Sequence, residues 1–303
     1  MKINQGEFQQ LTVIINEMCG LNLGEEKVYL VEQRLGPLAK GMGCDSFTAF
    51  LARIRENTNG ALKERLIEAI TTNETSFFRD GHPYEALKKF ILPRLAGHIQ
   101  ARKNKAVSRK GAKASVWCAA SSTGQEPYSV AITMLEFIEE NRQLGLNAED
   151  FSVLATDISP KVLAKGIAGT YTGMEISRGL PPPLRDKYFK QTGPCWEAVP
   201  ALQSMIDFRR INLTAPFTML GGFDLILCRN VLIYFRDDLK KKIIGQFNRM
   251  LSDEGLLLLG ACENMNGLSD EFTSLTHGQT IMYRPRRASP AAPGKERGMA
   301  CTI

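Results

Sequence analysis

The 303-residue chain has no apolar run long enough to cross a membrane. Its longest strongly apolar stretches, such as 255–261, are far shorter than the ~20 residues that a membrane helix needs. The N-terminal sequence MKINQGEFQQ lacks the basic and apolar regions of a secretory signal peptide. These absences argue against stable membrane insertion and secretion, and we expect a cytoplasmic protein.

Neither the cysteines nor the histidines form a recognisable motif. The seven cysteines are scattered without a C-x-x-C pair, so the sequence predicts neither a disulfide framework nor a zinc site. His82, His98 and His277 have no motif around them, and no Ser/His or Cys/His pair is evident. We therefore expect no metal site, and surface or packing roles for the histidines.

The composition is that of a soluble globular protein, with 44% apolar and 23% charged residues. The net charge of +6 is unevenly placed, because ten lysines or arginines but only two acids lie between Arg79 and Lys113. Residues 101–113 have the composition of a solvated linker, which is the ordinary explanation of such a run. Attraction of an acidic protein or of nucleic acid is the alternative, and the sequence does not separate the two.

Two parts with different hydrophobic periodicity follow one another. Up to about residue 90 apolar residues recur at helical spacing, as in Phe8, Leu11 and Ile15. From Ser115 short apolar strands alternate with helices, which predicts a parallel sheet with helices on both faces. We expect strands at 115–119, 151–156, 223–228, 256–260 and 280–283, and helices at 126–140, from 160 onward and at 237–250.

This periodicity suggests the domain organisation. We expect an N-terminal helical domain at 1–90, a basic linker at 91–114, an α/β domain at 115–284 and a disordered tail at 285–303. Residues 187–211 interrupt the β-α-β rhythm and contain a short strand at 205–209, which predicts a small inserted antiparallel piece beside the main sheet. Docking of a partner and an ordinary surface hairpin are equally good explanations of this insertion.

The most informative segment is VWCAASSTGQEP at 116–127, where an apolar strand runs into small residues and then into a helix. Small side chains let a ligand approach the backbone, and Gly124 permits a tight turn. The G-x-G-x-x-G motif of dinucleotide enzymes is absent, and Glu126 would repel a phosphate. An acid near a helix start is also favourable to the helix dipole. A cofactor with positive groups and no phosphate, such as S-adenosylmethionine, suits the pattern best.

Further polar residues follow the other expected strands. Ligands bind outside the carboxyl ends of the strands in open α/β sheets. Asp157 ends the second strand, where an acid accepts hydrogen bonds from ribose hydroxyls. Asn230 supplies an amide after the third strand. Tyr234 either reaches the ligand site at these strand ends or packs at its rim.

A polar cluster, TTNETSFFRD at 71–80, lies where the helical part meets the α/β part. Domain junctions are favoured ligand sites. Arg79 is suited to a bidentate pair with a carboxylate, which an amino-acid-bearing cofactor possesses. A capped helix with Phe77 and Phe78 in the core is the structural alternative.

In this order, the motifs TTNETSFFRD, WCAASSTGQEPYS, LATDIS and FDLILCRNVLIYF resemble the chemotaxis-receptor glutamate methyltransferase family, the CheR type. The resemblance covers nearly the whole chain. It implies an N-terminal helical domain, a Rossmann-like methyltransferase sheet and a small inserted antiparallel β-subdomain. It also implies that S-adenosylmethionine donates methyl groups to glutamates of chemoreceptor cytoplasmic domains, leaving S-adenosylhomocysteine as the product.

Transferred to matching positions, the resemblance implies site residues. It gives Tyr234 and Arg79 catalytic roles, with Tyr234 near the transferred methyl group. Gln125 departs from the family pattern, which often has a second glutamate there. The implied cofactor contacts are Asn73, Thr75, Arg79, Glu126, Asp157, Asn212, Leu213, Asn230 and Val231.

Two other functions remain open from the residues alone. An RNA or small-molecule methyltransferase would use the basic stretch 79–113 as a backbone contact, but stacking aromatics are lacking there. A non-catalytic binding module would keep the fold and sense the cofactor or scaffold a signalling complex, and the intact acids Glu126 and Asp157 argue against it. We expect a monomer that has a chemoreceptor partner and no nucleic-acid partner.

Overall fold

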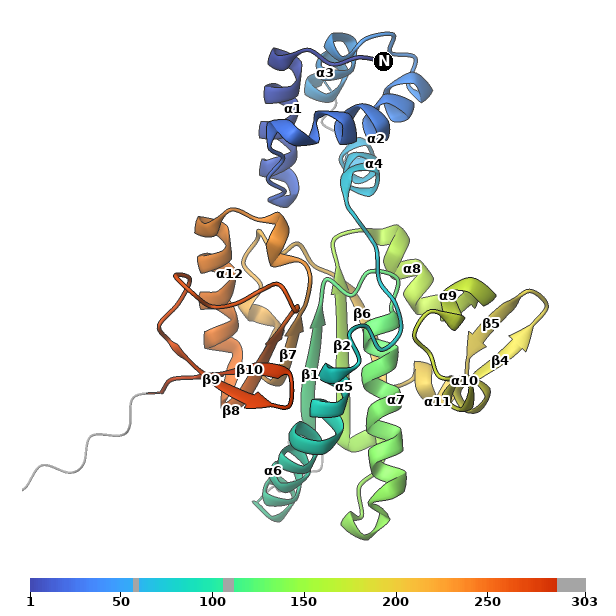
Figure 1. Ribbon diagram of the computed structural model, residues 1–303, viewed down its shortest axis with the longest axis vertical. Helices are drawn as coiled ribbons and strands as arrows, with labels where there is room; N and C mark the ends of the chain where they lie inside the picture. Colours follow the sequence, from blue (N-terminus) through green and yellow to red (C-terminus); the bar gives the residue numbers. More distant parts are fainter. Residues whose placement is uncertain (57–59, 106–111, 288–303) are drawn as a thin grey trace, which may run out of the picture.

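The structure is a computed structural model that describes residues 1–56, 60–105 and 112–287. The N-terminal helices form a bundle at one end of a large sheet (Figure 1). The first begins at a capping box between Asn4 and Glu7 and ends at Gly20, whose φ of 75° terminates it. Phe8, Leu11 and Ile15 are buried in the bundle core, as their helical spacing predicts. The helices are α1 (Gln5–Cys19), α2 (Val28–Gly41), α3 (Phe47–Glu56) and α4 (Gly60–Ile70).

The main sheet has seven strands in the described part of the chain, in the order β6-β2-β1-β7-β8-β10-β9. The expected parallel pairs are present from β6 to β8, but β10 pairs antiparallel with both β8 and β9, so the sheet is mixed. A tight turn with Gly278 at φ 57° makes this last hairpin possible. The bounds are β1 (Ala114–Ala119), β2 (Phe151–Asp157), β6 (Ile206–Arg210), β7 (Phe223–Cys228), β8 (Leu251–Leu259), β9 (Phe272–His277) and β10 (Thr280–Pro285).

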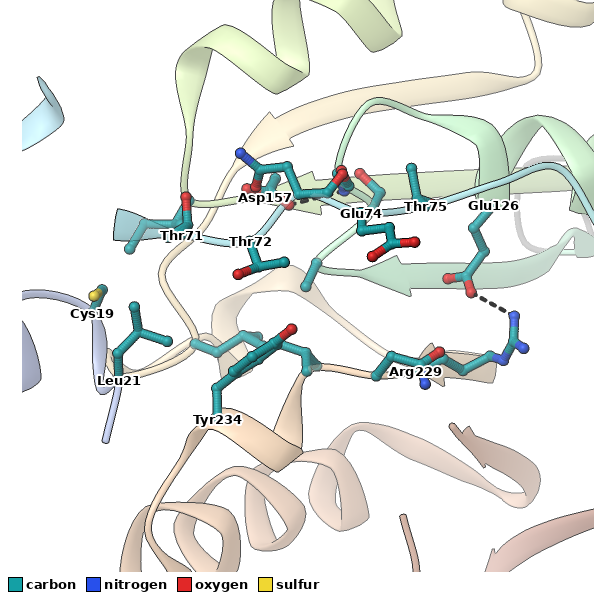
Figure 2. A pocket seen from close by; sticks show the side chains of 18 of the residues that line it. Cys19, Leu21, Thr71, Thr72, Glu74, Thr75, Glu126, Asp157, Arg229 and Tyr234 are labelled. Carbon is teal, nitrogen blue, oxygen red and sulfur yellow. Dashed lines mark hydrogen bonds and ion pairs between the residues drawn. The ribbon is translucent and has the colours of Figure 1, made fainter. Parts of the chain in front are cut away.

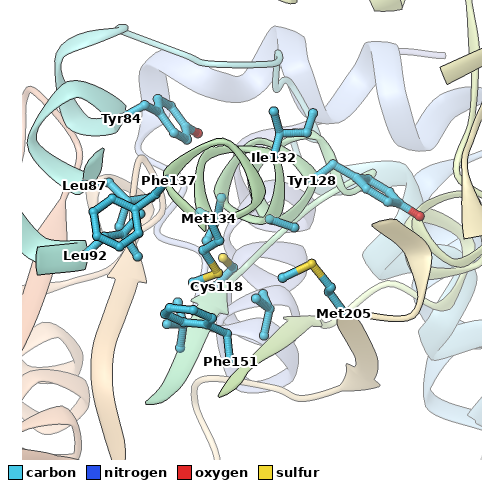
Figure 3. Close-up of a cluster of buried hydrophobic side chains, with 14 of the residues drawn as sticks. Tyr84, Leu87, Leu92, Cys118, Tyr128, Ile132, Met134, Phe137, Phe151 and Met205 are labelled. Atoms are coloured by element: carbon cyan, nitrogen blue, oxygen red, sulfur yellow. The ribbon is translucent and has the colours of Figure 1, made fainter. Parts of the chain in front are cut away.

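Helices cover both faces of the sheet, and the alternation along β1 shows how. Val116 and Cys118 belong to the buried cluster under α7 (Gln125–Glu140), part of which is shown in Figure 3. Trp117 and Ala119 belong to the cluster under α12 (Asp237–Met250). Successive side chains of a strand point to opposite faces, so one strand supplies both cores. A further helix, α8 (Pro160–Ala168), contacts β2 and β6.

The segment expected to be a basic linker is largely helical, and that expectation is wrong for 92–105. After α5 (His82–Ala86) and the π-helical turn Leu87–Ile91, α6 (Leu92–Lys105) packs against β1. Leu92, Leu95 and Ile99 are buried, while basic residues occupy its last turn, where they favour the helix dipole. The basic composition concealed this apolar spacing. The disordered tail expected at 285–303 is wrong for its first residues, because Pro285 ends β10 and Arg287 donates to the carbonyls of Asn248 and Leu251. Residues 106–111 and 288–303 lie outside the described residues.

The inserted subdomain is a three-stranded antiparallel sheet in the order β3-β5-β4, and it begins earlier than expected. The short strand expected at 205–209 is not part of it: β6 pairs parallel with β2 at the edge of the main sheet. Apolar and polar residues alternate along an exposed edge strand just as they do along a hairpin strand. The sequence pattern therefore did not show to which sheet residues 205–209 belong. The elements are β3 (Thr170–Thr172), α9 (Gly173–Ser177), α10 (Pro182–Tyr188), β4 (Phe189–Thr192), β5 (Cys195–Ala198) and α11 (Pro200–Gln203). In the described ranges, no helix combines the length and apolarity of a membrane span.

Candidate functional site

A cavity lies where the carboxyl ends of β6, β2, β1 and β7 meet the N-terminal bundle (Figure 2). Each strand contributes the residues that follow it, and the connection from α4 to α5 forms a further wall. Cys19 and Leu21, from the end of α1, lie at one end of the cavity in Figure 2, and Glu126 and Arg229 face each other at the other. The cavity therefore has an apolar end and a charged end.

All ten residues predicted for the site line this cavity, and their individual roles stay predictions. The structure also places Arg229 there, which the sequence interpretation did not assign. The residues predicted from the sequence are Asn73, Thr75, Arg79, Glu126, Asp157, Asn212, Leu213, Asn230, Val231 and Tyr234.

The turn after β1 has an unusual backbone that requires small residues. Ala120 and Ser122 have φ values of 57° and 50°, which non-glycine residues rarely adopt, and Gly124 has φ 96°. A Cβ on Gly124 would lie 3.0 Å from Cα of Gly166 and from the Tyr171 hydroxyl. Strained backbone of this kind concentrates at ligand sites. The turn thus exposes backbone to the cavity, as expected.

Asp157 is buried and firmly held at the end of β2. Its Oδ2 accepts the N–H of Ser122 at 2.9 Å, and its Oδ1 accepts the N–H of Ser159 at 3.0 Å. Burial raises the pKa of Asp157, and these backbone bonds oppose that rise. Each oxygen keeps acceptor capacity beyond its single bond. The carboxylate is therefore oriented and still able to accept two ligand hydroxyls.

The charged end of the cavity is organised by Arg229, whose side chain is only 1% exposed. Its Nη1 donates to Oε2 of Glu126 at 3.0 Å, and its Nη2 donates to Oδ2 of Asp80 at 2.7 Å. Burial raises the pKa of Glu126, and Arg229 is the largest opposing influence. One signal of this role was visible in the sequence: an arginine directly after the apolar strand 223–228 needs a charged partner if it is buried.

The segment 71–80 is not the capped helix considered as an alternative. It runs without helical structure from α4 to the turn before α5, although Phe77 is buried against Tyr171 and Phe189. Arg79 donates from Nη1 to the carbonyl of Glu74 at 3.2 Å, which leaves other guanidinium donors for a ligand. Ser122 Oγ donates to the carbonyl of Asn73 at 2.8 Å and so ties this segment to the turn after β1.

Asn212 uses its side chain within the protein. Its Nδ2 donates to the carbonyl of Met18 at 2.9 Å, and its Oδ1 accepts the N–H of Thr214 at 3.0 Å. Leu213 is buried in the core under α12. Contacts of this pair with a ligand would therefore come mainly from the backbone.

The loop after β7 is held by Glu263. Its carboxylate accepts four N–H groups, from Gly260, Asn230, Val231 and Ile233, at 2.7, 2.8, 3.0 and 3.2 Å. Tyr234 lies in the short helix Leu232–Tyr234 of this loop, and its carbonyl accepts the N–H of Asn22 from the bundle at 2.8 Å. Glu263 thus fixes the backbone that presents Asn230 and Tyr234.

Three polar atoms of residues that line the cavity fit a polar ligand. Ser121 Oγ, Asn230 Oδ1 and Arg229 Nε are buried without a hydrogen-bond partner, and such atoms in a native structure call for an explanation. All three residues follow strand ends, where the sugar and amino-acid parts of a nucleoside cofactor would lie. In the described ranges no group of three or more His, Cys, Asp or Glu is placed to hold a metal ion.

The sheet order, the small-residue turn after β1 and the buried carboxylate at the end of β2 define a Rossmann-like S-adenosylmethionine-dependent methyltransferase. In this chain a helical domain precedes the sheet and a small antiparallel sheet is inserted. The chain belongs to the CheR methyltransferase family. The all-alpha domain of that family matches residues 6–71, and its SAM binding domain matches residues 73–281.

Similar proteins cover almost the same length. The chain is 38% identical to chemotaxis protein methyltransferase Cher2 of Pseudomonas putida, over 92% of this chain and 98% of that protein. It is 37% identical to chemotaxis protein methyltransferase 1 of Pseudomonas aeruginosa, over 94% of this chain and all of that protein. For the chemotaxis protein methyltransferase of Salmonella typhimurium the identity is 32%, over 93% and 91%. The predicted family and cofactor are confirmed.

Proposed function

We propose that the protein transfers the methyl group of S-adenosylmethionine to glutamate carboxylates in the cytoplasmic domain of bacterial chemoreceptors, forming methyl esters. One structural observation supports this best. The cavity has a buried acid at the β2 end and opposite charges at the β7 end, as a cofactor with a ribose and an amino-acid group requires. The names of its relatives support a chemotaxis substrate.

The proposed cofactor contacts follow from the chemistry of each side chain. Asp157 accepts the ribose hydroxyls, Glu126 accepts the ammonium, and Arg79 donates to the carboxylate of the amino-acid end. Asn230 offers its unpartnered Oδ1 beside the same end. The remaining contacts are Asn73 and Thr75 in the connection from α4, the backbone of Asn212 and Leu213, and Val231.

The bound cofactor would supply a methyl group on a positively charged sulfur, which is a strong electrophile. A glutamate carboxylate, with a pKa of ~4.3, is already ionised at neutral pH, so the protein needs no general base. Its task is to align the acceptor oxygen and keep water away, and such alignment contributes on the order of 7 to 11 kcal/mol. Tyr234, in the cavity wall, shapes the surroundings of the methyl group.

Methyl transfer to labelled substrates tests the proposal. The protein is incubated with radiolabelled S-adenosylmethionine and either a chemoreceptor cytoplasmic fragment or RNA. We expect base-labile label on the receptor fragment and none on a fragment whose methylated glutamates are replaced by glutamine. Label on RNA, or cofactor binding without any transfer, would instead support one of the two alternative functions.

The variant Tyr234→Phe separates transfer from binding. It keeps the backbone carbonyl that bonds Asn22, so the loop should stay in place. We expect turnover to fall about tenfold, the value of roughly one hydrogen bond, with cofactor affinity largely kept. Turnover equal to that of the unmodified protein would remove Tyr234 from the proposed machinery.

The proposed substrate also bears on location. We infer that the protein acts in the cytoplasm, because the proposed target is the receptor's cytoplasmic domain.

A further inference from the structure

Arg229 connects three segments that are far apart in the sequence. It directly follows β7, it bonds Glu126 in the first turn of α7, and it bonds the connection between α4 and α5 twice. Nη2 donates to Oδ2 of Asp80 at 2.7 Å and also to the carbonyl of Arg79 at 2.9 Å. Arg229 is thus bonded to the backbone of one proposed cofactor-binding residue and to the side chain of another.

We propose that Arg229 is a positioning residue that aims the Glu126 carboxylate and the Arg79 backbone at the amino-acid end of the cofactor. The proposal rests on the proposed contacts of Glu126 and Arg79, but it requires no contact between Arg229 and the cofactor. It is independent of which substrate receives the methyl group.

The geometry requires an arginine. Two different nitrogens of one planar guanidinium serve partners on opposite sides, whereas the single ammonium of a lysine cannot span them. The guanidinium carbon also lies 5.8 Å from the centroid of the buried Tyr84 ring, which holds the group on a further side. Because the guanidinium is held on several sides, it fixes Glu126 and Asp80 relative to the end of β7.

The arrangement also sets the charge at this end of the cavity. Two carboxylates, Glu126 and Asp80, share one guanidinium, so one negative charge remains uncompensated by Arg229. That surplus suits an ammonium. Arg79, on the same wall, supplies the positive charge that suits a carboxylate. The surplus negative charge and the Arg79 guanidinium together match the ammonium and the carboxylate of a free amino-acid group.

Several groups influence the protonation of Glu126. Burial raises its pKa, Arg229 and then Arg79 lower it, and Glu263 raises it slightly. Tyr84, Cys118 and Cys228 are the other titratable groups that interact with it. Without Arg229, the largest influence that lowers the pKa of Glu126 would be lost, so this pKa would rise. A neutral Glu126 would attract an ammonium only weakly.

The test is the affinity for S-adenosylhomocysteine, measured by calorimetry from pH 5.5 to 8 on Arg229→Met, Glu126→Gln and the double variant. In Arg229→Met we expect weaker binding that recovers as pH rises, because Glu126 must lose its proton. Affinity should fall about tenfold for each pKa unit by which Glu126 lies above the pH of the measurement. In the Glu126→Gln background the pH dependence should be absent, and Arg229→Met should add less than about threefold.

Two results would overturn the inference. In the first, the affinity of Arg229→Met for S-adenosylhomocysteine depends on pH as it does in the unmodified protein. In the second, Arg229→Met lowers the affinity as much in the Glu126→Gln background as it does alone. Full affinity in Glu126→Gln would instead refute the proposed ammonium contact, and with it the premise. If receptor fragments were not methylated, the proposed function would fail, but these affinity measurements would still test the role of Arg229.

Two further variants control for folding. Arg102→Met removes another arginine–carboxylate pair, at the opposite end of β1 and β7, and should lower the melting temperature without changing affinity. If Arg229→Met does not fold, Arg229→Lys carries the test. It keeps the charge but cannot serve all three acceptors, so its affinity should be lower and its pH midpoint higher than in the unmodified protein. Unmodified affinity and midpoint in Arg229→Lys would contradict the bridging role.

Discussion

Two acids near this site, Asp157 and Glu263, are each oriented by backbone N–H groups. Asp157 accepts one N–H at each oxygen, and Glu263 accepts two at each. The difference is informative, because Asp157 retains acceptor capacity whereas that of Glu263 is used by the loop. The first is suited to binding a ligand and the second to holding the protein in shape.

Asp157→Ala should abolish measurable binding of S-adenosylhomocysteine. The change removes the proposed ribose acceptor and leaves the N–H groups of Ser122 and Ser159 without their partner. We expect an affinity loss of about a hundredfold or more, corresponding to about 3 kcal/mol. Calorimetry measures the affinity, and circular dichroism confirms that the variant is folded. Unchanged affinity would refute the assignment of this end of the cavity.

At the scale of elements, the loop after β7 depends on a residue of a different loop. Glu263→Gln keeps one acceptor oxygen but turns an amide N–H₂ toward N–H groups that need an acceptor. We expect the free energy of unfolding to fall by about 2 to 3 kcal/mol, and turnover to fall more than cofactor affinity.

Glu254→Gln is the matched control. Glu254 pairs with Arg94 and Arg284, but its side chain is 50% exposed, so the change should cost less than about 1 kcal/mol. Equal losses in the two variants would show that Glu263 does not organise the loop.

Helix α6 is tied to the sheet by a pair with a pH-dependent contribution. Burial would raise the pKa of Asp224, but the Arg102 guanidinium and the N–H of Ser115 outweigh it, so the pKa is lowered. An acid with a lowered pKa contributes stability above the pKa of the unfolded chain, ~3.9, and the contribution is lost as pH falls through the folded pKa.

Arg102→Met should therefore destabilise the protein at pH 7 more than in acid. Because Arg102 is about a third exposed, we expect a loss of roughly 2 kcal/mol at pH 7 rather than the full cost of breaking a buried pair. Urea unfolding at pH 7 and near pH 2.5 measures the difference between the variant and the unmodified protein. A difference that did not shrink in acid would contradict the ion pair's role.

At the scale of the molecule, the bundle and the sheet meet at the rim of the cavity. Arg34 of α2 donates to the carbonyls of Ile70 and Thr71 at 2.7 and 2.9 Å, which fixes the connection that forms one wall. From the other side, Asn212 Nδ2 donates to the carbonyl of Met18, and the carbonyl of Tyr234 accepts the N–H of Asn22. The stability of the junction is therefore expected to depend on these bonds.

Asn212→Ala tests this junction. It removes the bond to the Met18 carbonyl, so we expect about 1 kcal/mol lower stability and faster proteolysis of the segment 71–76. Affinity for S-adenosylhomocysteine should change less than about threefold, because the proposed contact is with the backbone. A loss of tenfold or more would show that the side chain itself binds the cofactor.

Most of the sheet was predictable because its strands and helices are local patterns. The strand 223–228 and the helix 237–250 have the bounds expected, since each carries its own apolar periodicity between clear turn residues. Part of the candidate site was predictable for the same reason, because Glu126, Asp157 and Asn230 lie at or just after strand ends. The helix α6 was not predicted because its basic composition is also typical of a linker, although Leu92, Leu95 and Ile99 have helical spacing.

The sequence by itself determined the alternation of strands and helices, the turn after β1 and the acids at the strand ends, because residues close in the chain encode them. Only the tertiary structure decided that β6 joins the main sheet, that Arg229 bridges Glu126 and Asp80, and that Glu263 holds the loop of Tyr234. These features are contacts between distant residues. Their partners are chosen by packing of the whole chain, which no local spacing records.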